Sequence, residues 1–159
     1  MSDEVPEHPT PLQPISRFTV APQEGHYAGR FMLLLDGQST GRLVPGARVE
    51  AQFSYGDRWL VLLGNDCMFD GYLCMLLLGP TLRVIDQREL GVGWGNAGFV
   101  MRLRVVAPST VEFSFFGDDC WRLTILPAPR FMWIDWGRRE TRQWGKLFSR
   151  RWMALDQIA

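Results

Sequence analysis

The sequence predicts an all-β protein: an antiparallel meander that closes as a barrel or sandwich, followed by one C-terminal amphipathic helix. Three observations support this fold class. Apolar and polar residues alternate along several short stretches, turn signals separate those stretches, and the apolar spacing changes near the C-terminus. The chain has 159 residues, which fits about one domain. Apolar residues make up 47% of it, which is enough to form a substantial core.

The first sixteen residues are predicted to form an extended tail. They contain Pro6, Pro9, Pro11 and Pro14, and so many prolines are incompatible with a helix. The chain start is acidic and lacks the basic and apolar regions of a signal peptide. No apolar run approaches the roughly 20 residues that span a bilayer. We therefore expect a cytoplasmic protein without an integral membrane segment.

Residues 17–136 are predicted to form an antiparallel β domain. Alternation of apolar and polar residues marks strands that begin near Val49, Phe99, Val111 and Trp121. Turn signals occur at residues 55–57, 79–80, 107–109, 117–119 and 127–129. Because the connections are short and no helical pattern intervenes, neighbouring strands are expected to pair antiparallel.

Two further stretches, residues 59–63 and 73–78, are apolar at every position. Such runs are typical of central strands that are buried on both faces, or buried on one face and covered on the other. We expect the C-terminal segment to provide that cover.

Residues 137–159 are predicted to pack on the β domain as a helix, over about residues 141–157. Apolar residues recur there at steps of three and four, at Trp144, Leu147, Phe148, Trp152, Leu155 and Ile158. The opposite side of this helix would be basic. An anionic membrane surface, an acidic protein and a nucleic acid each match that charge. For the chain as a whole, 17 basic residues balance 17 acidic ones, which argues against a nucleic-acid partner.

The composition gives little support for chemistry. The chain has three cysteines, Cys67, Cys74 and Cys120, and two histidines, His8 and His26. None of them has the close spacing of a zinc site, so no metal or cofactor is expected. A nucleophilic cysteine or serine would need a histidine on the β domain, and only His26 is a candidate.

The loop between the two all-apolar strands carries the densest set of polar side chains, with Asp66 and Asp70 close together. The two carboxylates could act as an acid–base pair or serve as polar turn residues. A second loop, rich in glycine, displays Trp94 and Asn96. We expect binding to a partner through aromatic anchors within a polar rim. The residues of this predicted site are Asp66, Phe69, Asp70, Trp94 and Asn96.

The order of features from residue 59 to residue 127 carries a resemblance. An apolar strand leads into Asp66-Cys67-Met68-Phe69-Asp70, and a Leu-rich strand follows at residues 73–78. After these come Asp86, Leu90-Gly91, a Gly-rich loop, and Phe113-Ser114-Phe115-Phe116 with Trp121. This order resembles small bacterial all-β proteins of toxin–immunity systems. Gly71 stands where that pattern continues with a second acidic residue. The resemblance implies a non-enzymatic protein that binds and blocks a protein partner, such as a cognate toxin.

The sequence thus predicts a non-enzymatic protein-binding module. Because an immunity protein often carries charge opposite to that of its toxin and this chain is neutral, the relevant charge must be local. The alternative is a β-barrel that holds a small apolar ligand in a cavity lined by Phe, Met and Leu. A third hypothesis is an enzyme that uses Asp66 or Asp70.

Overall fold

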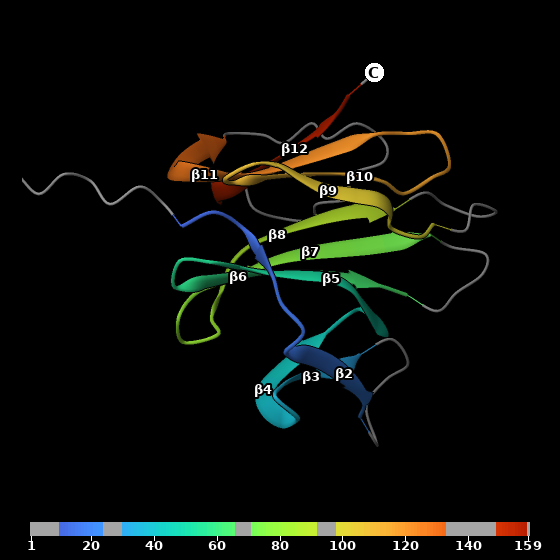
Figure 1. Ribbon diagram of the computed structural model, residues 1–159. Coiled ribbons are helices and arrows are strands. Elements are labelled where there is room, and N and C mark those ends of the chain that lie inside the picture. The colour runs from blue at the N-terminus through green and yellow to red at the C-terminus, as the bar shows by residue number, and fades with distance from the viewer. Residues whose placement is uncertain (1–9, 24–29, 66–70, 92–97, 133–148, 159) are drawn as a thin grey trace, which may run out of the picture.

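The computed structural model describes residues 10–23, 30–65, 71–91, 98–132 and 149–158. These residues form twelve strands and no helix. The strands make three antiparallel sheets, which lie one above another as three layers (Figure 1). The predicted all-β antiparallel fold is confirmed.

The middle layer is a five-stranded sheet. Its spatial order is β1 (Gln13–Pro14), β5 (Arg48–Tyr55), β6 (Arg58–Gly64), β7 (Tyr72–Leu78) and β8 (Val84–Gly91). The upper layer of Figure 1 is a four-stranded sheet in the order β12 (Ser149–Gln157), β11 (Trp121–Met132), β10 (Thr110–Ser114) and β9 (Met101–Ala107). The lower layer is a three-stranded sheet in the order β2 (Phe18–Pro22), β3 (Phe31–Leu35) and β4 (Gln38–Val44).

The predicted closure as a barrel or sandwich is wrong. The described strands stay in three separate sheets rather than one sheet that closes on itself or two that face each other. The reason is visible along β6, where successive side chains point to opposite faces. Leu60 and Leu62 join the core beneath the upper sheet, whereas Val61 and Leu63 join the core above the lower sheet. A sheet that is apolar on both faces needs a cover on each.

The two all-apolar stretches are therefore central strands buried on both faces, as their composition predicts. They form β6 and β7, which are neighbours in the middle sheet. The expected cover was the C-terminal segment. In the structure the upper sheet, with β12 as one of its strands, covers one face, and the lower sheet covers the other.

The predicted C-terminal helix is not present in the described residues. Residues 149–157 form β12, which pairs antiparallel with β11. Met153 lies opposite Ile125 and Leu155 opposite Leu123, and these side chains face the core between the middle and upper sheets. Arg, Met, Ala, Leu and Gln all favour helices in isolation, and here the tertiary pairing overrides that preference. The rest of the expected helix, residues 141–148, lies outside the described residues.

The turn signal at residues 127–129 does not end a strand. Pro127 and Pro129 lie inside β11, where the pairing with β12 is interrupted between Ile125 and Arg130. Proline has no N–H to donate to a ladder, so an irregularity of this kind is where a strand accommodates it. The signals at 55–57, 79–80, 107–109 and 117–119 do lie between consecutive strands.

The last part of the Pro-rich segment contacts the domain. β1 pairs with β5 through Gln13 opposite Ser54 and Pro14 opposite Phe53. Leu12 is buried, and its N–H donates to the carbonyl of Pro108, just after β9, at 2.8 Å. This segment therefore ties the middle sheet to the upper sheet.

Candidate functional site

The structure does not place the predicted binding residues. Asp66, Phe69, Asp70, Trp94 and Asn96 all lie outside the described residues, as do Cys67 and both histidines. The predicted site on these two loops stays a prediction. Within the described residues, the candidates for function are two surfaces and some clusters of polar side chains.

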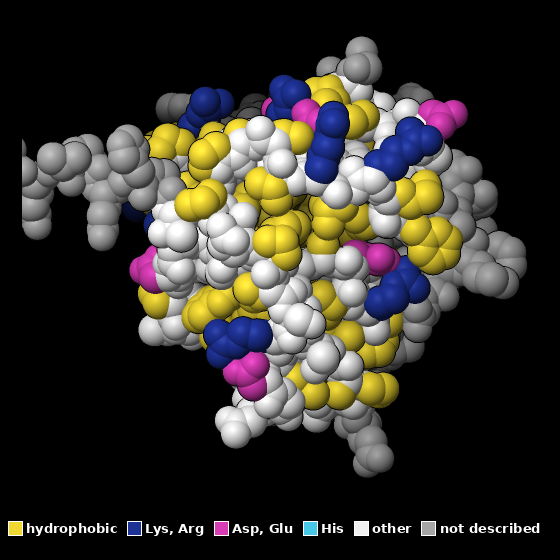
Figure 2. Space-filling view, viewed as in Figure 1, with side chains coloured by type: hydrophobic (Ala, Val, Ile, Leu, Met, Phe, Trp, Pro, Cys, Tyr) yellow, Lys and Arg dark blue, Asp and Glu magenta, His cyan; other side chains and the backbone are white. Residues whose placement is uncertain are grey.

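The first surface lies on β9, the edge strand of the upper sheet. We call it the β9 surface and define it by Phe99, Met101, Leu103, Val105 and Val106, which are 36% to 49% exposed. Hydrophobic side chains are visible on this face of the molecule between β9 and the middle sheet, with Arg side chains above them (Figure 2). Contiguous exposed apolar side chains commonly mark interaction sites.

The position of β9 explains this exposure. Val105 lies opposite Val111 of β10, so it shares the face that points toward the middle sheet. On this side the middle sheet ends in β1, which has only two residues. A sheet edge this short leaves Val105 and Leu103 partly uncovered. At the start of the surface, the guanidinium of Arg48 lies 5.2 Å from the ring centre of Phe99.

A charged network borders the β9 surface on the outer face of the upper sheet. The carboxylate of Glu112 on β10 accepts hydrogen bonds from Arg122 at 2.6 Å and from Arg104 at 2.7 Å. The Glu112 side chain is only 5% exposed, whereas those of Arg104 and Arg122 are 70% and 47% exposed. The hydrogen bonds from Arg122 and Arg104 lower the pKa of Glu112 below its ordinary value. Glu112 thereby fixes two guanidinium groups beside β9.

The second surface is a cleft of about 360 Å³ between the lower and middle sheets. The lower sheet covers β6 and β7 but not the polar part of β8. Gln87 and Glu89 of β8 lie opposite Leu76 and Cys74 of β7, so they share the face that looks toward the lower sheet. The apolar cover ends at these polar side chains, and a cleft remains at its margin. Its lining is formed by Arg30, Leu33, Gly41, Arg42, Leu43, Val44, Pro45, Leu76, Leu78, Val84 and Gln87.

On the face of the middle sheet that looks toward the lower sheet, Tyr72, Cys74 and Glu89 form a cluster of ionisable groups on β7 and β8. Burial raises the pKa of the Cys74 thiol to about 12, and the nearby Glu89 carboxylate adds to that shift. Burial also raises the pKa of Tyr72 above its ordinary value, with Cys74 and Glu89 contributing. Both groups are therefore protonated at neutral pH. Because the thiolate is the reactive form, Cys74 is a poor nucleophile.

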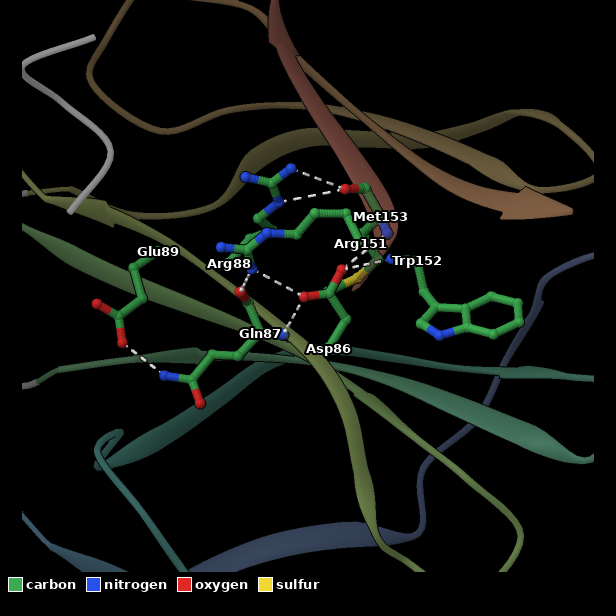
Figure 3. Close-up of polar contacts among 7 residues, drawn as sticks. All are labelled: Asp86, Gln87, Arg88, Glu89, Arg151, Trp152 and Met153. Atoms are coloured by element: carbon green, nitrogen blue, oxygen red, sulfur yellow. Dashed lines mark hydrogen bonds and ion pairs between the residues drawn. The ribbon is translucent and has the colours of Figure 1, made fainter. Parts of the chain in front are cut away.

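A buried carboxylate, Asp86 on β8, contacts Arg151, Trp152 and Met153 of β12 (Figure 3). One of its oxygens accepts the backbone N–H groups of Trp152 and Met153 at 2.8 and 2.9 Å. The other accepts from Arg151 at 3.1 Å. The neighbouring Arg88 donates to the carbonyl of Met153 at 3.0 Å. These contacts join the middle sheet to the upper sheet, which gives the cluster a structural role.

Sequence reasoning missed both surfaces. The alternation along β9 predicts a half-buried strand, and nothing in it indicates that the neighbouring sheet ends short. The cleft depends on which residues of β8 lie opposite β7, and that register is set only when the sheets assemble.

In the described residues, no group of three or more His, Cys, Asp or Glu side chains is placed to hold a metal ion.

Comparison with known proteins does not assign this chain to a family. No protein-family model matches the chain, and no curated protein or solved structure matches it. Within the described residues there is no helix with the length and apolar character needed to cross a membrane.

Proposed function

We propose that this chain is a non-enzymatic protein-binding module that holds an acidic, extended segment of a partner protein on its β9 surface. The observation that carries the proposal is the composition of this stretch. Residues 98–107 combine five exposed apolar side chains with Arg102 and Arg104, and they contain no acidic residue. Apolar contacts would supply affinity, and the arginines would select the charge of the partner.

The charge on β9 argues against a second copy of this chain as the partner. Two β9 strands placed edge to edge would bring Arg102 and Arg104 of one copy close to the same residues of the other. Like charges opposite each other destabilise a strand pair. β9 also has two irregularities in its register with β10, and such features blunt an edge against self-association. An acidic partner avoids the repulsion.

The proposal includes a toxin as the partner class to test first, because the sequence resembles immunity-type proteins. For a chain with no net charge, capture of a toxin would depend on a local charged patch. The exposed guanidinium groups of Arg104 and Arg122 provide a positive patch next to the apolar residues. The toxin surface would accordingly be acidic.

The test is a binding measurement on a partner captured from the native host and then purified. We expect Leu103→Ser and Arg104→Glu each to weaken the complex by about tenfold or more, since contacts near an interface centre are commonly worth more than 1 kcal/mol. Phe131→Ser is the matched control, because Phe131 is 67% exposed but lies on β11 and outside the β9 surface. Its complex should keep wild-type affinity.

The same measurement distinguishes the β9 surface from the loops predicted from sequence. If Asp66→Arg and Trp94→Ala weaken the complex while the β9 variants do not, the contact lies on those loops and the β9 proposal is wrong. Failure of the wild-type protein to retain any partner would contradict the binding-module proposal as a whole.

In the described residues, the structure lacks the barrel that the predicted alternative, an internal apolar ligand, requires. The described sheets do not close around a lumen. The cores between them are filled by side chains such as Phe113, Leu123 and Met75, which are essentially fully buried.

A further inference from the structure

The cleft between the lower and middle sheets combines an apolar floor with a cationic margin. Leu76 and Leu78 of β7 and Val84 of β8 contribute the middle-sheet wall, and Leu33 of β3 contributes the opposite wall. Two guanidinium side chains, Arg30 and Arg42, line the same cleft. At about 360 Å³ it lies near the lower end of small-molecule pockets, which span roughly 300–1,000 Å³.

The ion pairing of the arginines distinguishes these two from several others. Several other arginines in the described part of the chain are matched to carboxylates: Arg17 to Asp36, Arg48 to Glu50, Arg104 and Arg122 to Glu112, and Arg151 to Asp86. Arg30 and Arg42 form no ion pair with a described residue, and both are exposed. Two cations beside an apolar floor favour a ligand that carries the opposite charge.

The backbone of β4 is irregular where it borders the cleft. The pairing of β3 with β4 shifts between Met32 and Leu34, and Gly41 has a φ of 72°. Glycine adopts this left-handed conformation without steric cost. Irregularities of this kind redirect neighbouring side chains and are common beside binding sites. Here the neighbour is Arg42, which lines the cleft.

We propose that this cleft binds a small amphipathic anion, a molecule with one anionic head group and a compact apolar body. The apolar body would contact Val84 and Leu43, the lining side chains that are 39% and 36% exposed, and so remove apolar surface from water. The head group would accept charge-assisted hydrogen bonds from Arg30 and Arg42. The site goes beyond the proposed protein-binding function, because it lies between the lower and middle sheets rather than on β9.

A matched series of eight-carbon probes tests the proposal by calorimetric titration of the purified protein at low salt. Octanoate and octyl phosphate carry an anionic head, 1-octanol a neutral one, and octylammonium a cationic one. We expect at least one anionic probe to bind about tenfold more tightly than 1-octanol, since charge-assisted hydrogen bonds are roughly twice as strong as neutral ones. The stronger of the two anions identifies the head group as carboxylate or phosphate.

Three variants locate the site. Arg42→Met and Arg30→Met keep the apolar stem and remove the charge, so each should weaken the anionic probe by about fivefold to tenfold. Leu43→Trp, at a partly exposed residue of the lining, should fill the cleft and abolish binding. Arg130→Met is the control, because it makes the same charge change on β11, away from the cleft.

Each outcome of these titrations either supports or contradicts the proposal. Preference for the anion, lost in the cleft variants and kept in Arg130→Met, supports the proposal. Equal binding of 1-octanol, preference for octylammonium, no binding of any probe, or binding that survives Leu43→Trp overturns it. Leu43→Trp must keep the wild-type circular dichroism spectrum for its result to count, and the two methionine variants test the site independently. Because none of these residues belongs to the β9 surface, failure here leaves the protein-binding proposal intact.

Discussion

Asp86 on β8 and Arg151 on β12 form a buried ion pair that joins an edge strand of the middle sheet to an edge strand of the upper sheet. Arg151 Nη1 lies 3.1 Å from Asp86 Oδ1, and the two side chains are only 12% and 3% exposed. The second oxygen of Asp86 accepts the backbone N–H groups of Trp152 and Met153. One carboxylate therefore contacts both a side chain and the main chain of β12.

We expect Asp86→Asn to lower the free energy of unfolding by about 3 kcal/mol, because removing one partner of a buried pair leaves the other charge uncompensated. Both oxygens of Asp86 accept hydrogen bonds, so whichever one the amide N–H₂ group replaces, donors lose their acceptor. Urea unfolding followed by tryptophan fluorescence measures the change. Asp156→Asn, at an exposed residue of the same strand, is the control and should alter stability little. A loss of less than about 1 kcal/mol in Asp86→Asn would show that β12 is held mainly by its ladder with β11.

The same contact explains why the C-terminal helix could not be rejected from sequence. Trp152 and Leu155 fit a helical face together with residues farther upstream, and most residues of this segment favour helices. The competing signal, Met153 and Leu155 two residues apart, is short. In the folded protein this segment pairs with β11 and contacts Asp86, a carboxylate more than sixty residues away in the chain. The spacing of apolar residues within this segment does not reveal a contact with such a distant residue.

The burial of the central strands of the middle sheet on both faces, in contrast, could be predicted from the sequence. β6 and β7 are apolar at every position, and only a strand covered on both faces needs that composition. The identity of the covers was not predictable, because residues 18–22, 31–35 and 38–44 form the lower sheet without any signal that assigns them to one face. The binding residues predicted from sequence lie on loops outside the described residues, so their assignment stays a prediction.

We expect Glu112→Gln to change how stability depends on pH. Arg122 and Arg104 lower the pKa of Glu112 in the folded protein relative to its ordinary value of 4.5. A carboxyl group with a lowered folded pKa contributes stability that is present above its unfolded pKa and is lost as the pH falls. Thermal unfolding should show wild type and variant differing fully above the ordinary pKa of 4.5, and the difference should disappear as the pH falls through the lowered folded pKa, where the carboxylate becomes protonated.

The control for this experiment is Asp36→Asn. Its carboxylate pairs with Arg17 at 2.6 Å, but the two side chains are about half exposed, so water and salt screen the pair. The variant should show a smaller difference from wild type, and 0.5 M salt should reduce that difference further. If Glu112→Gln and Asp36→Asn behave alike, the shielded position of Glu112 has no electrostatic consequence.

We expect the two described thiols to differ sharply in reactivity. Cys74 is fully buried and its pKa is raised to about 12, whereas Cys120 is partly exposed. Iodoacetamide at pH 8 should modify Cys120 in the folded protein and leave Cys74 unmodified until urea unfolds the chain. Peptide mapping by mass spectrometry distinguishes the two sites. Modification of Cys74 at the rate of Cys120 would mean that the lower sheet opens readily from the middle sheet.

Gly98, at the start of the segment that leads into β9, packs against the aromatic ring of Phe115. A Cβ atom at Gly98 would lie 2.6 Å from Cε1 and Cζ of that buried ring, which is too close for ordinary contact. We expect Gly98→Ala to cost about 1–3 kcal/mol of stability, as overpacking of a filled core does. Gly91→Ala is the matched control, because its nearest neighbour would be Tyr72 Cδ2 at 3.7 Å.

The two alanine variants should differ in sign as well as in size. Without a steric conflict, replacement of glycine by alanine restricts the unfolded chain and stabilises a protein by about 0.4–1 kcal/mol. Gly91→Ala should therefore be neutral or slightly stabilising in urea unfolding, whereas Gly98→Ala is destabilising. Because Phe99 follows Gly98 directly and belongs to the β9 surface, the clash should also displace that surface and weaken partner binding. Equal stability of the two variants would show that Phe115 moves aside freely and that the contact does not position β9.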